Sequence, residues 1–514
     1  MKLNLKGIRN PADWPGYALP SYDIEAMAER TKKQPVWLHM GVGNIFRIFP
    51  AVLQQELIEA GHADYGIIAC ECYDEELITQ SLTPHDNLSL AVTLKSDGTM
   101  DKRVVASIAE TICTSTQQER LEEVFCSPSL QMITFTITEK GYAASSDNNR
   151  SNIMCTVADG LLARFKAGAP PIALVSLDNC SQNGTVLKNA IKSVAQEYPG
   201  FDEYLEKLSF PWTMIDKIVP RPSSDVAKVL QEDGLGDLEI RVTDKSIWIS
   251  DTFVNGEECG YLVIEDSFPN GRPPLEKSGQ MLQSQVFFTD RETVEKSEKM
   301  KVTTCLNPVH TALATAGCML GYKSMSDVIN DKRLFAFAQD MVHKESMPVV
   351  VDPKIIDPKE FLHDVLYVRL PNPFIKDTPQ RIVEDNSQKI SIRFGETIKA
   401  RRKATFSDSE MNAIPLFFAI YARYLMGIDD KWQTMPVEQD PRREELMSYM
   451  TEPYNLPALF SDPELFGVDL YAKGGILAEK ACGYFNELIQ GPGAVDRTLN
   501  KYYGYICDCN NHES

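Results

Sequence analysis

The amino-acid sequence predicts an α/β fold, with a doubly wound parallel sheet in residues 1–290 and a mostly α-helical domain in residues 291–514. The length of 514 residues exceeds what one hydrophobic core usually organises, which favours two large domains. Short apolar runs alternate with helical patterns in the first half, the order typical of a parallel sheet covered by helices. From about Val302 onward long helical patterns dominate, and the Pro- and Gly-rich stretch FPNGRPPLEKSG precedes the change.

The first predicted unit is a strand, a glycine-rich turn and a helix within residues 35–57. Its three parts are PVWLHM, GVGN and IFRIFPAVLQQELIEAG, of which the first is a short apolar run and the last has helical spacing. Further strands are predicted in DYGIIACE, LQMITFTIT and PIALVSLD. In the second half, helices are predicted in TALATAGCMLGY, PLFFAIYARYLMG and GGILAEKACGYFNELIQG.

Composition excludes several classes of function. The net charge of −20 argues against a nucleic-acid partner and against binding to an anionic membrane, because no excess of basic residues is present to neutralise phosphates. No run of about 18 apolar residues occurs, and the first residues do not resemble a signal peptide. The 12 cysteines and 7 histidines are scattered rather than set at metal-ligand spacing, so we expect no metal and a reducing, cytoplasmic location. The sequence does not indicate an oligomeric state.

The glycine-rich turn is a candidate for binding a dinucleotide. Gly41-Val42-Gly43 follows a predicted strand, and Asn44 and Ile45 open the helix. The first glycine permits a tight turn, the second lets the backbone approach a pyrophosphate, and the helix start supplies free N–H groups. A phenylalanine occupies the place of the usual third glycine, so on this pattern alone a plain strand-to-helix turn is an equal alternative.

An acid at the end of the second strand strengthens the dinucleotide hypothesis. The strand ends in Cys70-Glu71, and a carboxylate there can bind both ribose hydroxyls of NAD and repel the additional phosphate of NADP. Glu71 is the first candidate for this role and Asp74 the second. The alternative for either residue is an acid on the solvated surface. Together the turn and the acid predict NAD as the cofactor.

Several sequence blocks, in the same order, resemble the long-chain mannitol dehydrogenase family. A lysine followed by an Asn-x-x-His helix occurs in residues 299–314, and a Thr-Glu-Lys-Gly-Tyr turn in residues 138–142. The remaining blocks are Ser176-Leu-Asp-Asn179 with Asn183-Gly184, Met214-Ile-Asp216-Lys-Ile, and Asn372-Pro373 with Arg381 and Ser387-Gln-Lys389. The resemblance covers about residues 37–400. It implies a Rossmann-like nucleotide domain, a helical second domain and zinc-independent chemistry with NAD or NADP.

The resemblance also implies the kind of reaction. Within the family the chain is most similar to the fructuronate reductase (mannonate oxidoreductase) branch, notably in NIFRIFPAVLQQ and SQKISIRFGETIKA. The expected activity is therefore interconversion of a keto sugar acid and its secondary alcohol, D-fructuronate and D-mannonate, with NAD. The main alternative is a mannitol 2-dehydrogenase or arabinitol dehydrogenase acting on neutral polyols. A nucleotide-sensing protein with a decayed site is a third hypothesis, which the retained lysine, asparagines and histidine disfavour.

Four residues take catalytic roles by this resemblance. Hydride transfer to a ketone builds negative charge on oxygen, which requires preorganised donors and a source of a proton. Asn179 and Asn307 are the expected amide donors. Lys301 is the expected general acid in reduction and base in oxidation, provided that burial or a neighbouring cation lowers its pKa. His310 is expected to orient the substrate.

Four further residues are expected to bind substrate or cofactor. The resemblance assigns Asp216 to substrate orientation and Lys140 to the cofactor site. Arg381 and Lys389 are expected to contact substrate hydroxyls or a carboxylate. For Arg381 a structural ion pair is almost as good an interpretation.

The spacing of the catalytic lysine departs from the family pattern. The family has the lysine five residues before the asparagine, whereas Lys301 lies six residues before Asn307. In a regular helix one additional residue turns the side chain by about 100°. Pro308 lacks an N–H group, so a one-residue bulge before it would return Lys301 to the site. The alternatives are that Lys299 takes the role or that the lysine is lost.

Overall fold

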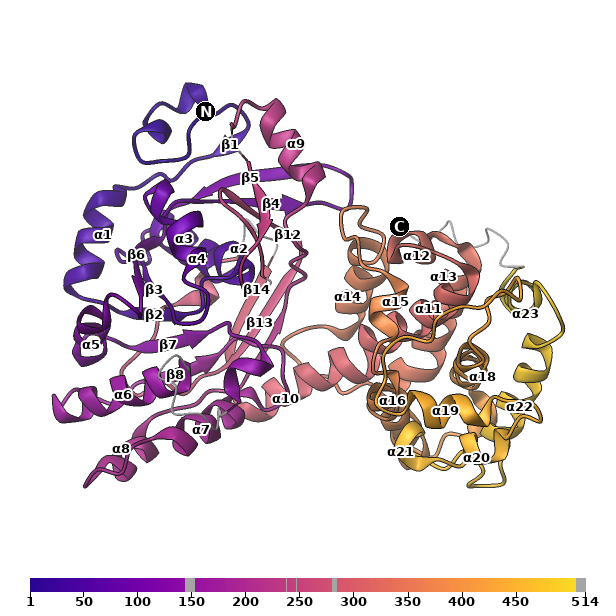
Figure 1. Cartoon of the computed structure of the whole chain (residues 1–514). Helices are drawn as coiled ribbons and strands as arrows, with labels where there is room; N and C mark the ends of the chain where they lie inside the picture. Colours follow the sequence, from indigo (N-terminus) through magenta and orange to yellow (C-terminus); the bar gives the residue numbers. More distant parts are fainter. Residues whose placement is uncertain (144–152, 237, 246, 280–283, 505–514) are drawn as a thin grey trace. The chain divides into compact units, whose positions relative to one another are not determined.

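The computed structural model describes residues 1–143, 153–236, 238–245, 247–279 and 284–504, and it divides into two compact units. The first unit is Met1–Glu295 and the second is Lys296–Ser514, so the division falls within helix α10 (Arg291–Met300). Within the described residues, every named strand lies in the first unit and the second unit consists of helices and loops (Figure 1). This confirms the predicted combination of an α/β domain with a mostly helical one.

A five-stranded parallel sheet organises the first unit. Its strand order is β6-β3-β2-β7-β8, and the labels follow one another in this order from top to bottom in Figure 1. The strands are β2 (Trp37–Met40), β3 (Ile67–Glu71), β6 (Ile108–Cys113), β7 (Met132–Phe135) and β8 (Ala173–Ser176). Four of them, all except β6, lie in the predicted strand segments. The order reverses beside β2, where nucleotides bind in folds of this kind.

Helices cover both faces of this sheet because successive strand residues point to opposite sides. In β2, Leu38 and Met40 belong to one hydrophobic core and Trp37 to another. The first core also contains residues of α5 (Gln118–Cys126), α6 (Ile153–Lys166) and α7 (Asn183–Val194), and the second contains residues of α3 (Pro50–Glu59). Strands buried on both faces read as continuous apolar runs, which is why the sequence predicted them.

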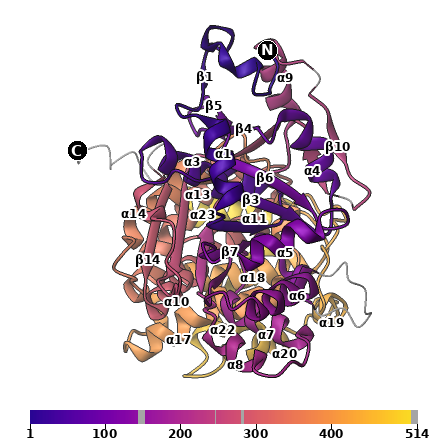
Figure 2. The same cartoon turned by 90° about the vertical axis from the view of Figure 1, so that its left-hand side faces the viewer.

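Besides the two-stranded pair of β10 (Ile240–Val242) and β11 (Trp248–Ser250), two larger sheets in the first unit were not predicted. One has the order β1-β5-β4-β12 and the other the order β14-β13-β9. Their strands are β1 (Tyr17–Ala18), β4 (Ser89–Leu94), β5 (Met100–Val105), β9 (Thr213–Asp216), β12 (Phe253–Glu257), β13 (Gly260–Glu265) and β14 (Ser284–Thr289). The N-terminal segment lies beside α9 (Ser224–Glu232), as Figures 1 and 2 both show, and the Met1 amino group donates to the Gly234 carbonyl at 2.8 Å.

Three long helices form the centre of the second unit. They are α11 (Asn307–Leu320), α18 (Ala413–Leu425) and α22 (Ile476–Leu488), and α18 packs against both others. Each overlaps a predicted helical segment, although α11 begins four residues and α18 two residues before its segment. The helices that surround them are α12 (Met325–Asn330), α13 (Lys332–Asp340), α14 (Pro358–His363), α15 (Pro379–Val383), α16 (Asn386–Ile390), α17 (Glu396–Lys403), α19 (Arg443–Tyr449), α20 (Leu456–Phe460), α21 (Pro463–Phe466) and α23 (Ala494–Tyr503). No helix of the described chain is long and apolar enough to cross a membrane.

Wide π-helical turns interrupt the helices of the second unit. They are η6 (Lys301–Cys305), η7 (Met341–Ser346), η9 (Asp364–Arg369) and η10 (Ser391–Gly395). Such turns are rare and occur frequently at functional sites, because the additional residue redirects the side chains on either side of it. Three of the four contain a basic residue that is central to the site described next.

Candidate active site

The two glycines of the turn after β2 have different surroundings. Gly41 has φ +95°, and a Cβ atom there would lie 2.5 Å from the Thr136 carbonyl oxygen, so only glycine fits. Gly43 has an ordinary backbone conformation, and a Cβ atom there would meet no atom within 4 Å. Gly41 therefore shapes the turn, whereas Gly43 leaves open the space in which a pyrophosphate would approach helix α2 (Asn44–Ile48).

Phe46 occupies the place of the third glycine of the nucleotide-binding pattern, and its ring packs against the sheet. Its ring stacks on the His39 ring at 4.0 Å between centroids, and both side chains are buried. His39 makes hydrogen bonds with Thr134 Oγ1 at 2.6 Å and Thr136 Oγ1 at 2.9 Å, and burial lowers its pKa to about 3. The neutral imidazole thus holds α2 against the sheet. In the usual nucleotide-binding pattern, the third glycine has this role because it lets the helix pack closely on the strand.

Glu71 ends strand β3, as predicted, and its carboxylate turns back onto the chain. Oε2 accepts from the Val42 N–H at 3.0 Å, and Oε1 accepts from the N–H groups of Cys72 and Tyr73 at 3.0 and 2.9 Å. Burial raises the pKa of Glu71, and these backbone donors lower it. Asp74 is also engaged, because its Oδ2 accepts from Thr243 Oγ1 at 2.6 Å. The role of either acid as a ribose ligand stays a prediction.

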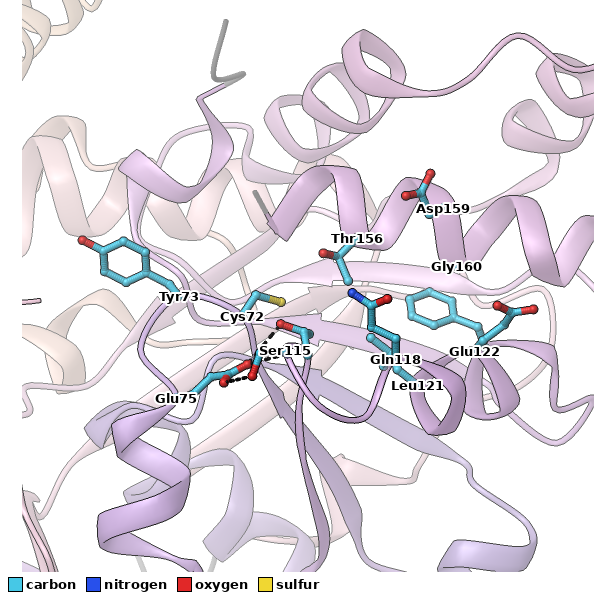
Figure 3. Close-up of a pocket in the computed structure, with 12 residues that line it drawn as sticks. Cys72, Tyr73, Glu75, Ser115, Gln118, Leu121, Glu122, Thr156, Asp159 and Gly160 are labelled. Carbon is cyan, nitrogen blue, oxygen red and sulfur yellow. Dashed lines mark hydrogen bonds between the residues drawn. The ribbon is translucent and has the colours of Figure 1, made fainter. Parts of the chain in front are cut away.

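A cavity of about 580 Å³ opens at the ends of strands β3 and β6 (Figure 3). Its walls come from the loops after these strands and from α5 and α6, and include Cys72, Tyr73, Thr114, Gln118 and Thr156. It begins at the residue after Glu71, on the edge of the sheet where the nucleotide is expected. Its size and position fit the adenosine half of a dinucleotide, and the sequence alone did not reveal it.

Asp178 organises the two motif segments that carry Lys140 and Asn179. Its carboxylate accepts from the N–H groups of Ile137 and Thr138 at 3.0 and 2.9 Å, and from the Tyr142 hydroxyl at 2.6 Å. Burial raises the pKa of Asp178, against the opposing effect of these donors. Lys140 and Asn179 are both exposed. The Thr-Glu-Lys-Gly-Tyr turn and the Asp-Asn pair therefore form one local structure, which explains why they occur together.

Asn183 connects this region to the strand that carries Asp216. Its Nδ2 donates to Thr213 Oγ1 at 2.8 Å, and its Oδ1 accepts from the Thr213 N–H at 2.9 Å. The next residue must be glycine, since a Cβ atom at Gly184 would lie 2.3 Å from the Phe210 carbonyl oxygen. Thr213 begins β9 and Asp216 ends it, where its side chain is buried.

The helix around the candidate catalytic lysine is irregular, as the spacing predicted. The Leu306 N–H donates to the Lys301 carbonyl at 3.1 Å, an i to i−5 hydrogen bond that closes the wide turn η6. In this pattern the Thr303 carbonyl would pair with the N–H of residue 308, which is proline and has none. The Thr397 hydroxyl donates to that carbonyl instead, at 3.1 Å. The predicted bulge before Pro308 is confirmed.

The two candidate lysines, on either side of the start of the wide turn, differ in their exposure to solvent. Lys301 begins η6 and is only 3% exposed, whereas Lys299 lies in the last turn of α10 and is exposed. Burial is the condition under which a lysine pKa falls toward neutrality. The structure therefore favours Lys301 over Lys299 as the acid or base, although its catalytic role stays a prediction.

His310 and Arg381 share one carboxylate in the second unit. Arg381 donates from Nε to Asp377 Oδ1 at 2.6 Å and from a second nitrogen to Oδ2, so the ion pair foreseen as its alternative role is present. The His310 Nε2 atom lies 3.9 Å from Asp377 Oδ2. Burial lowers the pKa of His310 to about 4, so its imidazole is neutral at pH 7. Asn307 begins the helix that carries His310.

Two further basic residues near His310 were missed by the sequence analysis. They are Arg369, at the end of η9, and Arg393, in η10. Both lower the pKa of His310, and Arg393 also lowers that of Lys389, which donates to the Glu384 carbonyl. The second unit thus concentrates positive charge around His310 in a chain whose net charge is −20. The available signal was the spacing of Lys389 and Arg393, four residues apart on a helix.

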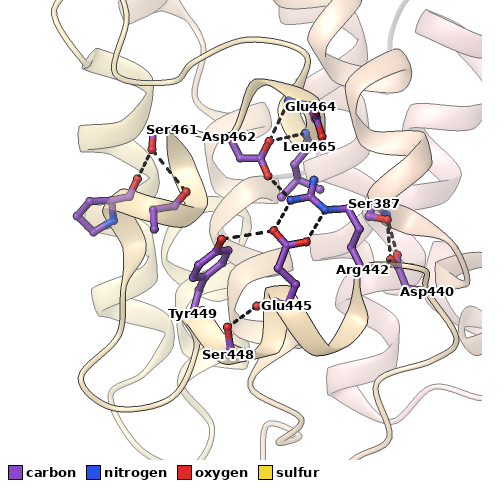
Figure 4. A network of polar contacts seen from close by, with 12 residues as sticks. Ser387, Asp440, Arg442, Glu445, Ser448, Tyr449, Ser461, Asp462, Glu464 and Leu465 are labelled. Atoms are coloured by element: carbon purple, nitrogen blue, oxygen red, sulfur yellow. Dashed lines mark hydrogen bonds and ion pairs between the residues drawn. The ribbon is translucent and has the colours of Figure 1, made fainter.

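A polar network fixes the helix that carries Lys389 (Figure 4). The Ser387 N–H and hydroxyl donate to Asp440 at 2.8 and 2.6 Å, which anchors α16. Two residues after Asp440, the Arg442 guanidinium binds Glu445 and Asp462, each at 2.6 Å. The serine of the Ser-Gln-Lys block is therefore a positioning residue.

The described residues do not contain a metal site. They include no group of three or more His, Cys, Asp or Glu side chains that could hold an ion. The cysteines among them are free thiols.

Comparison with known proteins identifies relatives along the whole chain. Family models described as the mannitol dehydrogenase Rossmann domain and the mannitol dehydrogenase C-terminal domain match residues 36–277 and 293–481. The chain is 45% identical to D-mannonate oxidoreductase of Thermotoga maritima, over 98% of this chain and 99% of that protein.

Two solved structures share the fold. A D-sorbitol dehydrogenase in substrate-free form has a TM-score of 0.80 at 22% identity, with 97% of this chain and 100% of that chain covered. Pseudomonas fluorescens mannitol 2-dehydrogenase, in a ternary complex with NAD and D-mannitol, has a TM-score of 0.71 at 24% identity, with 98% and 100% covered.

Proposed function

The chain belongs to the mannitol dehydrogenase family and is an oxidoreductase, and we propose that it interconverts D-fructuronate and D-mannonate with NAD. The observation that carries this proposal is the 45% identity, over almost the whole of both chains, to D-mannonate oxidoreductase. The positive charge gathered around His310 supports it, because a sugar acid carries a carboxylate and a neutral polyol does not. The free cysteines and the dependence on NAD are in keeping with a cytoplasmic location.

The residues fit NAD at the first unit. The space left by Gly43 and the cavity beside β3 and β6 would hold the pyrophosphate and the adenosine, respectively. When bound, NAD supplies or accepts the hydride. In reduction of the ketone, the amides of Asn179 and Asn307 would donate to the carbonyl oxygen as negative charge develops on it. The Lys301 ammonium would then transfer a proton to that oxygen, and in oxidation the neutral amine would take it back.

The proposal predicts a preference for the sugar acid. The catalytic efficiency kcat/KM with D-mannonate should exceed that with D-mannitol by at least about tenfold, the value of roughly 1.4 kcal/mol from one charged contact. Initial rates with NAD and a panel of hexonates and neutral polyols measure this ratio. Equal or better turnover of D-mannitol would instead favour the alternative function, a dehydrogenase of neutral polyols.

The acidic surroundings of the nucleotide site predict a preference for NAD over NADP. Glu71 ends β3, and Glu75, Glu122 and Asp159 line the adjacent cavity, so a 2′-phosphate would meet like charge there. The kcat/KM for NADH should exceed that for NADPH by at least about tenfold, or roughly 1.4 kcal/mol. Fructuronate reduction measured with both cofactors tests this, and an equal or higher value with NADPH would contradict it.

A further inference from the structure

Arg393 lies within the second unit beside the candidate substrate residues. It is in the wide turn η10, which packs against both η6, where Lys301 lies, and α11, where His310 lies. Its guanidinium donates to the hydroxyl of Thr311, the residue after His310. The position of Arg393 therefore depends on the same helix that presents the substrate-orienting histidine.

The hydrogen bonds of Arg393 leave most of its donors unused within the described residues. A guanidinium has five N–H donors, and Thr311 takes one of them. Burial lowers the pKa of Arg393 to about 10, and no carboxylate of the described chain opposes this effect. Arg393 is partly exposed, and a cation that is partly removed from water without a counterion is stabilised by binding an anion.

Three other arginines of the second unit bind a carboxylate or several backbone carbonyls of the protein itself. Arg381 is bound by two nitrogens to Asp377, and Arg401 binds two backbone carbonyls and Glu410. Arg423 donates to three backbone carbonyls, those of Leu488, Ile428 and Asp429. Compared with these three, Arg393 is the guanidinium whose donors remain available to a ligand.

We propose that Arg393 binds the carboxylate of the sugar-acid substrate and thereby selects sugar acids over neutral polyols. The inference rests on the proposed function and adds the residue that recognises the negative charge of the substrate. The planar guanidinium can bind a carboxylate through two parallel hydrogen bonds. The positive charge of Lys389 lies close enough for Arg393 to lower its pKa, so it adds to the attraction. Arg381 is the weaker candidate, because Asp377 already neutralises it.

Substitution of Arg393 tests the proposal with two substrates. In Arg393→Gln, kcat/KM with D-mannonate should fall by about 100-fold, mainly through KM, since a charge-assisted bidentate contact is lost. Activity with D-mannitol should change by less than about threefold, so the ratio between the substrates collapses. Arg393→Lys should recover part of the loss, because it keeps the charge without the planar fork. Lys399→Gln, which removes an exposed positive charge from α17, is the matched control and should change neither activity.

A binding measurement separates this inference from the proposed function. Calorimetric titration of the NADH complex with D-mannonate should show weaker binding to Arg393→Gln than to the wild type, with unchanged affinity for NADH. Equal losses on both substrates, or an unchanged ratio in an enzyme active on D-mannonate, would overturn the role of Arg393 and leave the proposed function intact. A wild type that neither oxidises nor binds D-mannonate would overturn both. Binding without turnover, lost in Arg393→Gln, would refute only the proposed reaction.

Discussion

Replacing Lys301 with alanine should lower kcat for fructuronate reduction by about 10³-fold while KM changes by less than about threefold. General acid–base catalysis typically supplies 10²- to 10⁴-fold, and its loss acts on the transition state rather than on substrate binding. The buried position of Lys301 at the start of η6 is the structural reason for this expectation. Steady-state kinetics in both directions, together with single-turnover hydride transfer, measure the effect.

Lys299→Ala is the matched control for this experiment. Lys299 lies two residues earlier and is exposed, so its removal should change kcat by less than about twofold, as expected for a surface substitution away from the site. Thermal unfolding of both variants excludes a simple loss of folding. If Lys299→Ala lost the activity and Lys301→Ala retained it, the acid or base would be Lys299 and our account of the wide turn would be wrong.

The wide turn could be predicted because one proline and one spacing both pointed to it. Nine residues separate Lys301 from His310, which in a regular helix amounts to about half a turn beyond two full turns. The two side chains would then face in opposite directions. The turn η6 takes up the additional residue, and the Thr397 hydroxyl satisfies a carbonyl that Pro308 cannot. That donor comes from a helix about 90 residues later, so the sequence could predict the irregularity but not what stabilises it.

The parallel sheet was predictable for a similar physical reason. Strands buried on both faces, such as IIACE and MITF, form short apolar runs that stand out between helical patterns. Strand β5, with the sequence MDKRVV, carries three charged residues and gives no such signal. Its partner β4 lies nearby in the chain, but β12 pairs with β4, and β13 with β9, across long stretches of chain. Their sheets were therefore missed although their strands are regular.

The sequence predicted the positions of site residues that belong to a motif. It did not predict the hydrogen bonds and burial of those residues, which depend on tertiary contacts. The position of Glu71 at the end of β3 followed from the strand pattern. Its acceptance of N–H groups from Val42 and from the following loop did not, because those contacts depend on the fold of the turn. Arg393 was missed because a basic residue on a helix is usually solvated, and only packing around η10 distinguishes it. For Arg381 the sequence allowed either a substrate contact or a structural ion pair, and it could not identify Asp377 as the partner.

Alanine at Gly43 should impair cofactor binding without affecting the fold. A Cβ atom at this position meets no protein atom within 4 Å, and the backbone conformation suits any residue, so the melting temperature should stay within about 2 °C of the wild type. The same Cβ atom would occupy the space through which a pyrophosphate reaches the start of α2. The KM for NAD should therefore rise by about 10- to 100-fold, equivalent to roughly 1.5–3 kcal/mol of lost charge-assisted hydrogen bonding.

Alanine at Gly41, in contrast, should lower the stability of the protein itself, and comparing the two variants separates stability from cofactor affinity. Its φ of +95° is unfavourable for any residue with a side chain, even without the cofactor. A Cβ atom there would also lie 2.5 Å from the Thr136 carbonyl oxygen. We expect a loss of about 2–4 kcal/mol in the free energy of unfolding, from backbone strain together with steric overlap. Chemical denaturation and titration with NADH, applied to both variants, separate stability from affinity. A stable Gly43→Ala protein that binds NADH as tightly as the wild type would show that the pyrophosphate does not approach this turn.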